Sequence, residues 1–526
     1  MNPLLEVEDL SIAFGARTVV SGVSFSLEAG ECLAIVGESG SGKSVTARAL
    51  LGLAGEGSRV RATTMRFDDT AILDASPQRL RSLRGREIGL VSQGALVALD
   101  PLRPIGREVA DALRLHTSMT AAQRADRAIE LLAEAGLPEP ELRYGQRPDE
   151  LSGGMRQRAV IASAIAMRPR LLIADEPTTA LDTTVQARIL ELLERLRAQG
   201  AAILLISHDL AVVSRIASRI AVMQGGSIVE AGTTENVLSS PQHPYTRSLI
   251  AAVPASRPRG SLLGSGDLTP APAPEPPTTE AVLVARGVSL RFGPRQAVHD
   301  VSLSLRRGTT LGIVGESGSG KTTLARLCLA LARPDSGDVE VLGAPWSSLS
   351  ERERRAGRRR IGAIYQDALS SFDPRFTVGQ ILADALSGGR TRRAGAEVNE
   401  LLEQVGLAPE LARRRPRLLS GGQQQRVAIA RAIAPWPDIL VCDEPVSSLD
   451  VLVQAQVLDL LDEIQRARGL SYLFISHDLG VVRHMSDSVL VMRHGRVVES
   501  GPTEDVFSAP RHDYTRELIA AAPRLT

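Results

Sequence analysis

The sequence predicts an α/β chain made of two copies of one domain fold, and three repeated features support this fold class. A glycine-rich loop that follows a strand-like apolar run and opens a helix-like run occurs in both halves. An apolar run that ends in Asp-Glu and another that ends in Ser-His also occur in both halves, in the same order. Because self-similarity of this kind marks repeated structural units, we expect two homologous domains in tandem.

The composition indicates a globular protein with no dominant charge. Its 526 residues are 43% hydrophobic, enough for the cores of two or more domains. The 61 basic and 60 acidic side chains nearly cancel, so we expect no nucleic-acid partner. The three cysteines, at 32, 328 and 442, lie far apart, which favours a reducing compartment and predicts neither a disulfide framework nor an Fe–S cluster. The N-terminus has no secretory-signal pattern and no apolar run reaches about 18 residues, so any membrane role would depend on partner chains.

The repeated landmarks set the expected domain boundaries. The first domain is expected over residues 1–257 and the second over residues 280–526. Residues 258–279 are rich in proline and small polar residues, a composition that favours an extended tether over a packed element. In the first domain, residues 4–29 alternate apolar and polar side chains around turns, which predicts an antiparallel sheet.

The glycine-rich loops have the spacing and context of phosphate-binding loops. Glycines let successive N–H groups point inward, and the N-terminus of the following helix adds to their attraction for phosphate oxygens. The lysine can reach the β- and γ-phosphates, and the hydroxyl after it suits a bound Mg²⁺. Glycine turns that bind nothing are the weaker alternative, because both copies match. The predicted binding residues are Gly37, Ser39, Gly40, Ser41, Gly42, Lys43 and Ser44, and Gly315, Ser317, Gly318, Ser319, Gly320, Lys321 and Thr322.

Two aromatic residues are candidates for contact with the base of a nucleotide. Phe14 precedes the first loop, and Phe292 holds the same place before the second. Either ring could stack on an adenine face or be an ordinary core aromatic.

The segments that follow the loops predict a polar ligand and an inserted helical region in each domain. Gln93 and Gln366 each follow a short apolar strand, where the side chain could bind Mg²⁺ or the attacking water. Residues 106–137 and 378–407 have helical periodicity. The arginine runs at 354–360 and 413–415 are expected on solvated surfaces. Leu-Ser-Gly-Gly-Arg at 386–390 is interpreted as a glycine turn that ends a helix.

A second anion-binding end is predicted where Leu-Ser-Gly-Gly opens a helix. The free N–H groups of a helix N-terminus and the serine hydroxyl can bind an anion. The match is weak alone, but in both halves it precedes the Asp-Glu strand at the same spacing. The residues concerned are Ser152, Gly153 and Gly154, and Ser420, Gly421 and Gly422.

The Asp-Glu and Ser-His pairs predict the chemistry of the site. Buried parallel strands are expected to end at Asp175 and at Asp443, whose carboxylates suit Mg²⁺. Glu176 and Glu444 could accept a proton from the water that attacks a γ-phosphate, although capping carboxylates are a simpler alternative. A later strand in each half ends at His208 or His477, which could hydrogen-bond the γ-phosphate or be structural.

This full motif order resembles that of the ATP-binding-cassette (ABC) ATPases, over nearly the whole chain twice. The resemblance implies two P-loop domains, each with a RecA-like core, an antiparallel β subdomain and an inserted helical subdomain. It also implies ATP and Mg²⁺ at two composite sites, each shared head to tail by both halves. Site one would join Lys43, Ser44, Gln93, Asp175, Glu176 and His208 to Ser420, Gly421 and Gly422. Site two would join Lys321, Thr322, Gln366, Asp443, Glu444 and His477 to Ser152, Gly153 and Gly154.

Two further segments look like those of the dipeptide, oligopeptide and nickel importers. They are the stretches that start at Gln93 and Gln366, and the closing His-Pro-Tyr-Thr-Arg at 243–247 and His-Asp-Tyr-Thr-Arg at 512–516. This resemblance implies a peripheral ATPase at the cytoplasmic face of a membrane, bound to two permease chains and, through them, to an extracytoplasmic solute-binding protein. A soluble tandem-cassette ATPase that acts on ribosomes or DNA and a sugar-importer ATPase are the alternatives.

Overall fold

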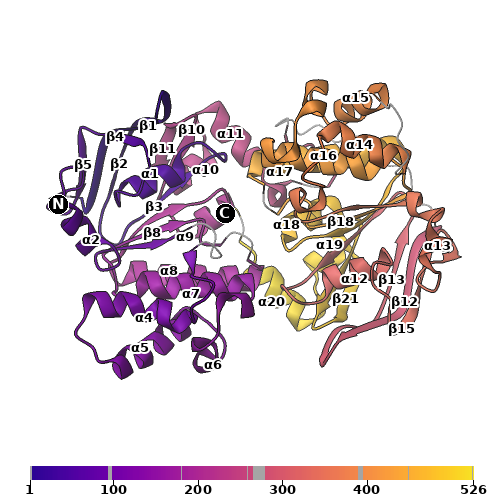
Figure 1. Ribbon diagram of the computed structural model, residues 1–526, viewed down its shortest axis with the longest axis horizontal. Coiled ribbons are helices and arrows are strands. Elements are labelled where there is room, and N and C mark those ends of the chain that lie inside the picture. The colour runs from indigo at the N-terminus through magenta and orange to yellow at the C-terminus, as the bar shows by residue number, and fades with distance from the viewer. Residues whose placement is uncertain are drawn as a thin grey trace. The chain divides into compact units, whose positions relative to one another are not determined.

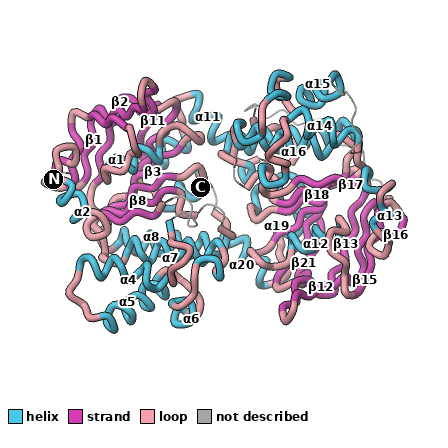
Figure 2. Tube along the Cα trace, in the orientation of Figure 1, coloured by secondary structure: helices cyan, strands magenta, loops and turns pink. Residues whose placement is uncertain are grey.

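The computed structural model describes residues 3–92, 98–178, 181–257, 259–264, 279–388, 395–447, 449–523 and 525. The chain forms two compact units, Met1–Ile250 with Pro523–Thr526, and Ala251–Ala522. Each unit contains a six-stranded sheet, an antiparallel sheet and a group of helices, as Figures 1 and 2 show. The prediction of two α/β copies of one fold is therefore confirmed.

The core of the first unit is a largely parallel sheet in the order β11-β10-β3-β9-β8-β7. The apolar runs before the predicted motifs form its central strands, and every residue of β3, β8 and β9 is buried. Parallel strands covered on both faces need such uninterrupted apolar runs. The bounds are β3 (Cys32–Val36), β7 (Ile88–Val91), β8 (Leu171–Asp175), β9 (Ala202–Ile206), β10 (Arg219–Gln224) and β11 (Ser227–Thr233).

The predicted antiparallel sheet precedes and flanks this core. Its strands run in the order β2-β1-β5-β6, and β4 also pairs with β1. One apolar cluster joins the inner face of this sheet to α1 and to the core strands, so the glycine-rich loop is held between two sheets. The bounds are β1 (Leu5–Phe14), β2 (Arg17–Leu27), β4 (Ser58–Arg61), β5 (Thr64–Phe67), β6 (Thr70–Ala71), α1 (Lys43–Ala49) and α2 (Pro77–Leu83).

The inserted helical region is also present. In Figure 1, α4, α5 and α6 lie together on the side of the core sheet opposite β1 and β2. The bounds are α4 (Ile105–His116), α5 (Ala121–Glu134), α6 (Pro140–Tyr144), α7 (Gly153–Ile165), α8 (Thr183–Ala198), α9 (Leu210–Ile216), α10 (Thr234–Ser239) and α11 (Pro244–Ala251), with short 3₁₀ turns at Pro148–Glu150 and Pro254–Ser256.

The second unit repeats this plan. Its core sheet has the order β17-β18-β19-β14-β20-β21, and its antiparallel sheet the order β13-β12-β15-β16. The strands are β12 (Ala281–Phe292), β13 (Arg295–Arg306), β14 (Thr310–Val314), β15 (Ser336–Val341), β16 (Ala344–Pro345), β17 (Ile361–Ile364), β18 (Ile439–Asp443), β19 (Ser471–Ile475), β20 (Ser488–Arg493) and β21 (Arg496–Pro502).

The helices of the second unit occupy equivalent places. The predicted glycine turn is confirmed at Gly388, which caps α14 with a left-handed φ of 61°. The helices are α12 (Lys321–Cys328), α13 (Glu351–Arg354), α14 (Val378–Ser387), α15 (Gly395–Gln404), α16 (Gly421–Ile433), α17 (Val451–Arg468), α18 (Leu479–Met485), α19 (Thr503–Ser508) and α20 (Asp513–Ala521), with 3₁₀ turns at Gly357–Arg360, Leu369–Ser371, Pro409–Arg413 and Pro416–Leu418.

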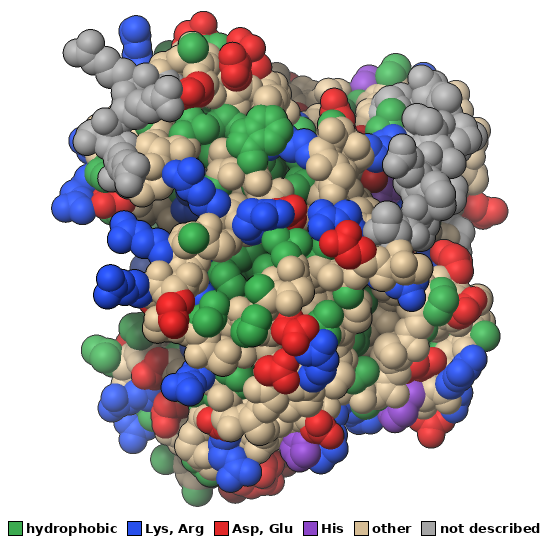
Figure 3. Space-filling model, turned by 90° about the vertical axis from the view of Figure 1, so that its right-hand side faces the viewer, with side chains coloured by type: hydrophobic (Ala, Val, Ile, Leu, Met, Phe, Trp, Pro, Cys, Tyr) green, Lys and Arg blue, Asp and Glu red, His purple; other side chains and the backbone are tan. Residues whose placement is uncertain are grey.

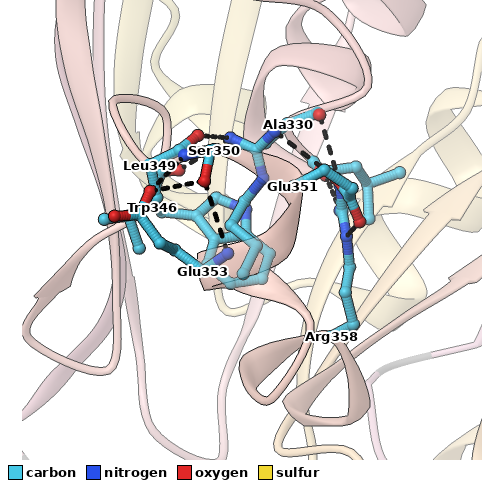
Figure 4. Close-up of polar contacts among 9 residues, drawn as sticks. Ala330, Trp346, Leu349, Ser350, Glu351, Glu353 and Arg358 are labelled. Atoms are coloured by element: carbon cyan, nitrogen blue, oxygen red, sulfur yellow. Dashed lines mark hydrogen bonds and ion pairs between the residues drawn. The ribbon is translucent and has the colours of Figure 1, made fainter.

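The arginine run at 354–360 departs from the expected solvated surface at two positions, whereas Arg355, Arg359 and Arg360 are exposed as expected. Arg354 and Arg358 do not form a solvated surface, since their side chains are only 13% and 26% exposed. Arg354 donates to the carbonyl oxygens of Trp346 (3.1 Å) and Leu349 (2.6 Å). Arg358 pairs with Glu351 at 2.6 Å, as Figure 4 shows, and its guanidinium lies over the Trp346 ring. These arginines therefore hold α13 on the sheet, whereas the run at 413–415 is exposed as expected.

The described part of the proline-rich segment is packed. Leu263 is 1% exposed, and the backbone N–H groups of Leu263 and Gly264 donate to Asp459 of α17 at 2.9 and 2.7 Å. The sequence favoured an unpacked tether, so residues 259–264 differ from that expectation. The amino-acid composition of a segment does not show whether a distant carboxylate will bind its backbone N–H groups, so the sequence could not predict this contact.

A buried histidine lies in the same region of the second unit. His484 of α18 is 5% exposed and is faced by Asp459 and Asp462 of α17, by Arg259 and by the backbone of Arg257. Burial lowers the pKa of His484, and this effect outweighs the contacts with the Arg257 backbone and the two carboxylates, which raise it.

Cys32, Cys328 and Cys442 are free thiols and buried. None of the helices within the described ranges is both long and apolar enough to cross a lipid bilayer.

Candidate functional site

The glycine-rich loop joins β3 to α1 through glycines that no other residue could replace easily. Gly37 has a φ of 146°, and a Cβ there would lie 2.0 Å from the carbonyl oxygen of Met223. Gly42, at the N-cap of α1, has a φ of 99°. Gly315 repeats the arrangement in the second unit, with a φ of 150° and only 2.2 Å to the oxygen of Met492.

The lysine of each loop folds back over it. Lys43 Nζ donates to the carbonyl oxygens of Gly37 and Glu38, both at 2.7 Å. Lys321 Nζ makes the equivalent bonds at 2.7 and 2.8 Å. Both lysines are 6% exposed, so each ammonium is held close to the loop and to the start of a helix. A loop with these features can bind a phosphate group.

The hydroxyl after each lysine meets the strand-ending aspartate. Ser44 Oγ donates to Asp175 at 2.8 Å, and Thr322 Oγ1 donates to Asp443 at 3.2 Å. Burial raises the pKa of both carboxyls, although the hydroxyl contact lowers it. The second carboxylate oxygen of Asp175 is buried and accepts no hydrogen bond, and the guanidinium of Arg48 lies 3.8 Å from it. A hydroxyl and a carboxylate brought together in this way are oxygen ligands of the kind that a hard divalent cation prefers.

The described residues contain no group of three or more His, Cys, Asp or Glu that could hold a metal unaided. A cation at this place would therefore take part of its coordination from a bound phosphate or from water, as Mg²⁺ commonly does in proteins.

A glutamate and a histidine lie in contact in each unit. His208 Nδ1 lies 3.3 Å from Glu176 Oε1, and His477 Nδ1 lies 3.3 Å from Glu444 Oε2. Burial lowers the pKa of both histidines, but the hydrogen bond and charge of the glutamate outweigh it, so each pKa lies above its ordinary value. Gln366 Nε2 donates to Glu444 at 2.8 Å, whereas Gln93 lies outside the described residues.

Both glutamates have an unusual backbone. Glu176 and Glu444 each have a left-handed φ of 51°. For a residue with a Cβ this conformation costs about 1–3 kcal/mol, and such strain concentrates at functional sites. The turn after each strand thus fixes the direction of one carboxylate at the edge where the other site residues gather.

The Ser-Gly-Gly turns open α7 and α16. Ser152 Oγ accepts from the N–H of Met155 at 3.4 Å, and Ser420 Oγ accepts from that of Gln423 at 3.3 Å. The serine and the glycine after it are exposed in both units. Gly422 must be glycine for a local reason, because a Cβ there would lie 2.5 Å from Val453. The predicted helix N-termini are confirmed, and their phosphate contacts remain a prediction.

The two aromatic candidates have different surroundings. Phe14 ends β1 and packs partly on the core of the first unit, while Phe292 ends β12 and is 55% exposed. An exposed ring at this place is free to stack on a base, but adenine contact stays a prediction for both residues.

Sequence reasoning missed one contact with the loop. The Tyr245 hydroxyl accepts a hydrogen bond from the N–H of Glu38 at 2.8 Å, and the Tyr514 hydroxyl accepts one from that of Glu316 at 3.0 Å. The repeated closing motif could have signalled a shared role for both tyrosines, although not the identity of their partner.

Comparisons with known proteins agree with this geometry. The family described as ABC transporter matches residues 20–179 and 298–447, and the family described as oligopeptide/dipeptide transporter, C-terminal region, matches residues 229–275 and 498–526. The chain is 45% identical to "Peptidoglycan transport ATP-binding protein YejF" of Agrobacterium fabrum, with 99% of this chain and 96% of the relative covered. It is 41% identical to "Oligopeptide transport ATP-binding protein OppD" of Mycobacterium tuberculosis, with 100% and 99% covered.

Two further comparisons extend this result. The chain is 42% identical to "Glutathione import ATP-binding protein GsiA" of Escherichia coli (strain K12), with 99% of this chain and 89% of the relative covered. A solved structure named "RNase-L Inhibitor" superposes with a TM-score of 0.64 at 21% identity, over 95% of this chain and 91% of that one, which supports the fold alone.

A phosphate loop, a strand-ending Asp-Glu pair and a histidine in contact with the glutamate define a nucleotide hydrolase of the P-loop class. The chain belongs to the ABC transporter family, and it is an ABC-type ATPase with two cassettes in one polypeptide.

Proposed function

We propose that this ATPase energises the import of peptides or related small solutes across a membrane. The observation that carries the proposal is the repeated C-terminal region of the oligopeptide/dipeptide transporters, at residues 229–275 and 498–526. The relatives that match the chain over nearly its full length are named for peptidoglycan, oligopeptide and glutathione transport. These names disfavour the ribosome, DNA and sugar-import alternatives.

The proposed catalytic units are two composite ATP sites. Each would use one cassette's loop, Asp-Glu pair and histidine together with the Ser-Gly-Gly turn of the other cassette. Support comes from membership of the ABC family and from the exposure of Ser152 and Ser420 at helix N-termini, where unpaired N–H groups suit a γ-phosphate.

The proposed cofactor is Mg²⁺. Its ligands in the first site would be Ser44, Asp175 and Gln93, and in the second Thr322, Asp443 and Gln366. The contacts of Ser44 with Asp175 and of Thr322 with Asp443, which bring two oxygen ligands together in each unit, support this assignment. Bound Mg²⁺ would neutralise charge on the β- and γ-phosphates.

The remaining site residues would have separate roles in ATP hydrolysis. Lys43 and Lys321 would bind phosphate oxygens while they keep their contact with the carbonyl oxygen of Gly37 or Gly315. Glu176 and Glu444 would accept the proton of the attacking water, while the histidine beside each glutamate orients the carboxylate and can hydrogen-bond the γ-phosphate. Gln366, which already contacts Glu444, would link the γ-phosphate to the loop that begins at this residue.

The proposed partners are two permease chains and, through them, an extracytoplasmic solute-binding protein, with the ATPase at the cytoplasmic face of the membrane. In the second unit, an open hollow of about 530 Å³ is lined by Leu331, Tyr365 and Pro435, with Arg358 and Arg431 at its wall. Figure 3 shows hydrophobic side chains gathered among basic ones on the face of this unit that it draws. A short amphipathic helix of a permease would suit such a surface, because its apolar side chains could enter the hollow.

Reconstitution tests this function. The chain is combined with its candidate permeases in vesicles and supplied with a solute-binding protein, and ATP-dependent uptake of a labelled oligopeptide is measured. We expect uptake that stops in the Glu176→Gln/Glu444→Gln variant. Failure of the wild-type chain to associate with any permease pair would contradict the proposal.

A further inference from the structure

The closing motif of each cassette lies against the phosphate loop of the same cassette. Tyr245, in α11, accepts a hydrogen bond from the N–H of Glu38, and Tyr514, in α20, accepts one from the N–H of Glu316. The tyrosines are 8% and 1% exposed. Because each pair is about 200 residues apart in the chain, the fold rather than local sequence brings the hydroxyl to the loop.

Each tyrosine is held in place by its own motif. The Glu230 carboxylate accepts from the N–H groups of Gln242 (2.8 Å) and His243 (3.0 Å). His243 Nδ1 then accepts from the N–H of Tyr245 at 3.2 Å, at the start of α11. A side chain anchored in this way approaches the loop with little freedom.

The second cassette repeats the anchor. Glu499 accepts from the N–H groups of Arg511 (2.8 Å) and His512 (3.1 Å), and His512 Nδ1 accepts from the N–H of Tyr514 at 3.1 Å. The guanidinium of Arg493 also lies 4.5 Å from the centre of the Tyr514 ring, where the first cassette has Gln224 at the end of β10. The same design therefore occurs twice, with an additional ring contact in the second cassette.

The hydrogen bond fixes the peptide plane on which the catalytic lysine rests. The N–H of Glu38 and the carbonyl of Gly37 belong to one peptide unit, and that carbonyl accepts from Lys43 Nζ at 2.7 Å. The tyrosine thus holds the N–H end of a planar group whose oxygen end holds the lysine. In the second cassette the peptide between Gly315 and Glu316 is held in the same way by Tyr514 and Lys321.

Two physical consequences follow for the lysine. A rotation of this peptide would turn its oxygen away from the ammonium, so the tyrosine hydroxyl opposes that rotation. A hydrogen bond to the N–H also polarises the carbonyl on the same peptide and strengthens its contact with the ammonium.

We propose that Tyr245 and Tyr514 are positioning residues for ATP binding, and that their hydroxyls keep the phosphate loop and its lysine in the arrangement that receives the β- and γ-phosphates. The closing motif of the oligopeptide/dipeptide region then serves the nucleotide site directly. This inference rests on the ATPase activity and does not depend on which solute is imported.

The test removes one hydroxyl at a time from the full chain. Tyr245→Phe, Tyr514→Phe and the double variant keep the ring and lose the hydrogen bond. Equilibrium binding of a fluorescent ATP analogue and the KM and kcat of ATP hydrolysis are measured. A net hydrogen bond of ordinary strength corresponds to about a 5-fold change in an equilibrium constant. We expect the KM and the dissociation constant of the double variant to rise by about 3- to 10-fold, with kcat changed less.

The matched control is Tyr472→Phe. The Tyr472 hydroxyl donates to the carbonyl oxygen of Leu461 at 2.7 Å, and the residue is fully buried in β19. This variant also loses a buried hydroxyl contact, so we expect a lower melting temperature with the KM for ATP unchanged. An unchanged KM in the Tyr245→Phe/Tyr514→Phe variant, or an equal rise of KM in Tyr472→Phe, would overturn the proposal.

A double-mutant cycle separates positioning from a general loss of stability. The effect of Tyr514→Phe on nucleotide affinity is measured in the wild-type chain and in a Lys321→Arg background, because arginine cannot keep the same contacts with the loop carbonyls. If the tyrosine acts through the lysine, the effects of the two substitutions on the free energy of nucleotide binding are non-additive. Strictly additive effects on the binding free energy would overturn the proposal that Tyr514 acts through Lys321. Inactive transport with normal ATP kinetics in the wild-type chain would count against the import function and leave this inference intact.

Discussion

Exchange of both proposed general bases for glutamine is expected to stop turnover without stopping ATP binding. Glu176 and Glu444 have the same left-handed backbone and the same contact of 3.3 Å with a histidine. Glutamine has the same size and can keep a hydrogen bond to that histidine, so the shape of the site should persist. What it lacks is a carboxylate that can accept the proton of water.

General base catalysis contributes about 10²- to 10⁴-fold to a rate, so we expect kcat to fall by at least about 100-fold in the double variant. The Lys43 and Lys321 contacts with their loops do not involve these carboxylates. ATP affinity should therefore change by less than about 3-fold, since removal of a transition-state interaction lowers kcat without weakening ground-state binding.

The assay combines steady-state phosphate release with retention of labelled ATP after gel filtration. Glu235→Gln serves as a control, because this exposed carboxylate in the first turn of α10 is given no part in ATP binding or proton transfer. We expect retained ATP and very slow release of phosphate in the Glu176→Gln/Glu444→Gln variant, and near wild-type turnover in the control. Wild-type turnover in the double variant would refute the assignment of the two glutamates.

Three other predictions concern the loop and the second unit. Gly315→Ala should abolish nucleotide binding by the second cassette, because the new Cβ would lie 2.2 Å from the Met492 oxygen; normal binding in a filter assay would contradict the loop geometry. Leu263→Ala should destabilise the second unit by about 2–5 kcal/mol in urea unfolding, and the half-buried Leu262→Ala should cost less; equal effects would show that the segment does not pack as described. His484→Gln should reduce acid sensitivity. Burial lowers the pKa of His484 in the folded state, so the unfolded chain binds the proton more readily. The stability of the wild-type chain should therefore fall as the pH drops below the ordinary pKa of 6.5, and less so in His484→Gln. The same loss of melting temperature in both proteins between pH 7.5 and about 5.5 would contradict this.

The parts of the fold that could be predicted from the sequence are those that neighbouring residues determine. The buried strands before Gly37 and Glu176 are uninterrupted apolar runs, and a parallel sheet covered on both faces requires them. The loops, the Ser-Gly-Gly helix starts and the Gly388 turn also follow from neighbouring residues. The meeting of Glu176 with His208 could be predicted because the carboxyl ends of adjacent parallel strands lie at one edge of the sheet.

The features that the sequence did not predict depend on backbone partners far along the chain. Tyr245 meets the N–H of Glu38, and Asp459 meets two N–H groups near Leu263. Every residue except proline carries such an N–H, so the pattern of side chains does not show which one a polar group will find. Arg354 was misjudged because, besides a 3.4 Å contact with Glu351, it donates to the carbonyl oxygens of Trp346 and Leu349, and the side-chain pattern does not show such backbone partners.

The central proposal, that each cassette completes the ATP site of the other, is tested most directly by one measurement. Ser152→Arg places a large cation at the Ser-Gly-Gly turn of the first cassette, where it would obstruct a bound γ-phosphate. A photoreactive ATP analogue is then crosslinked to the full chain, and the labelled peptides are assigned to the pocket of Lys43 or to that of Lys321. We predict loss of label at the Lys321 pocket with the Lys43 pocket retained. Loss at the Lys43 pocket with normal labelling at Lys321 would contradict the account.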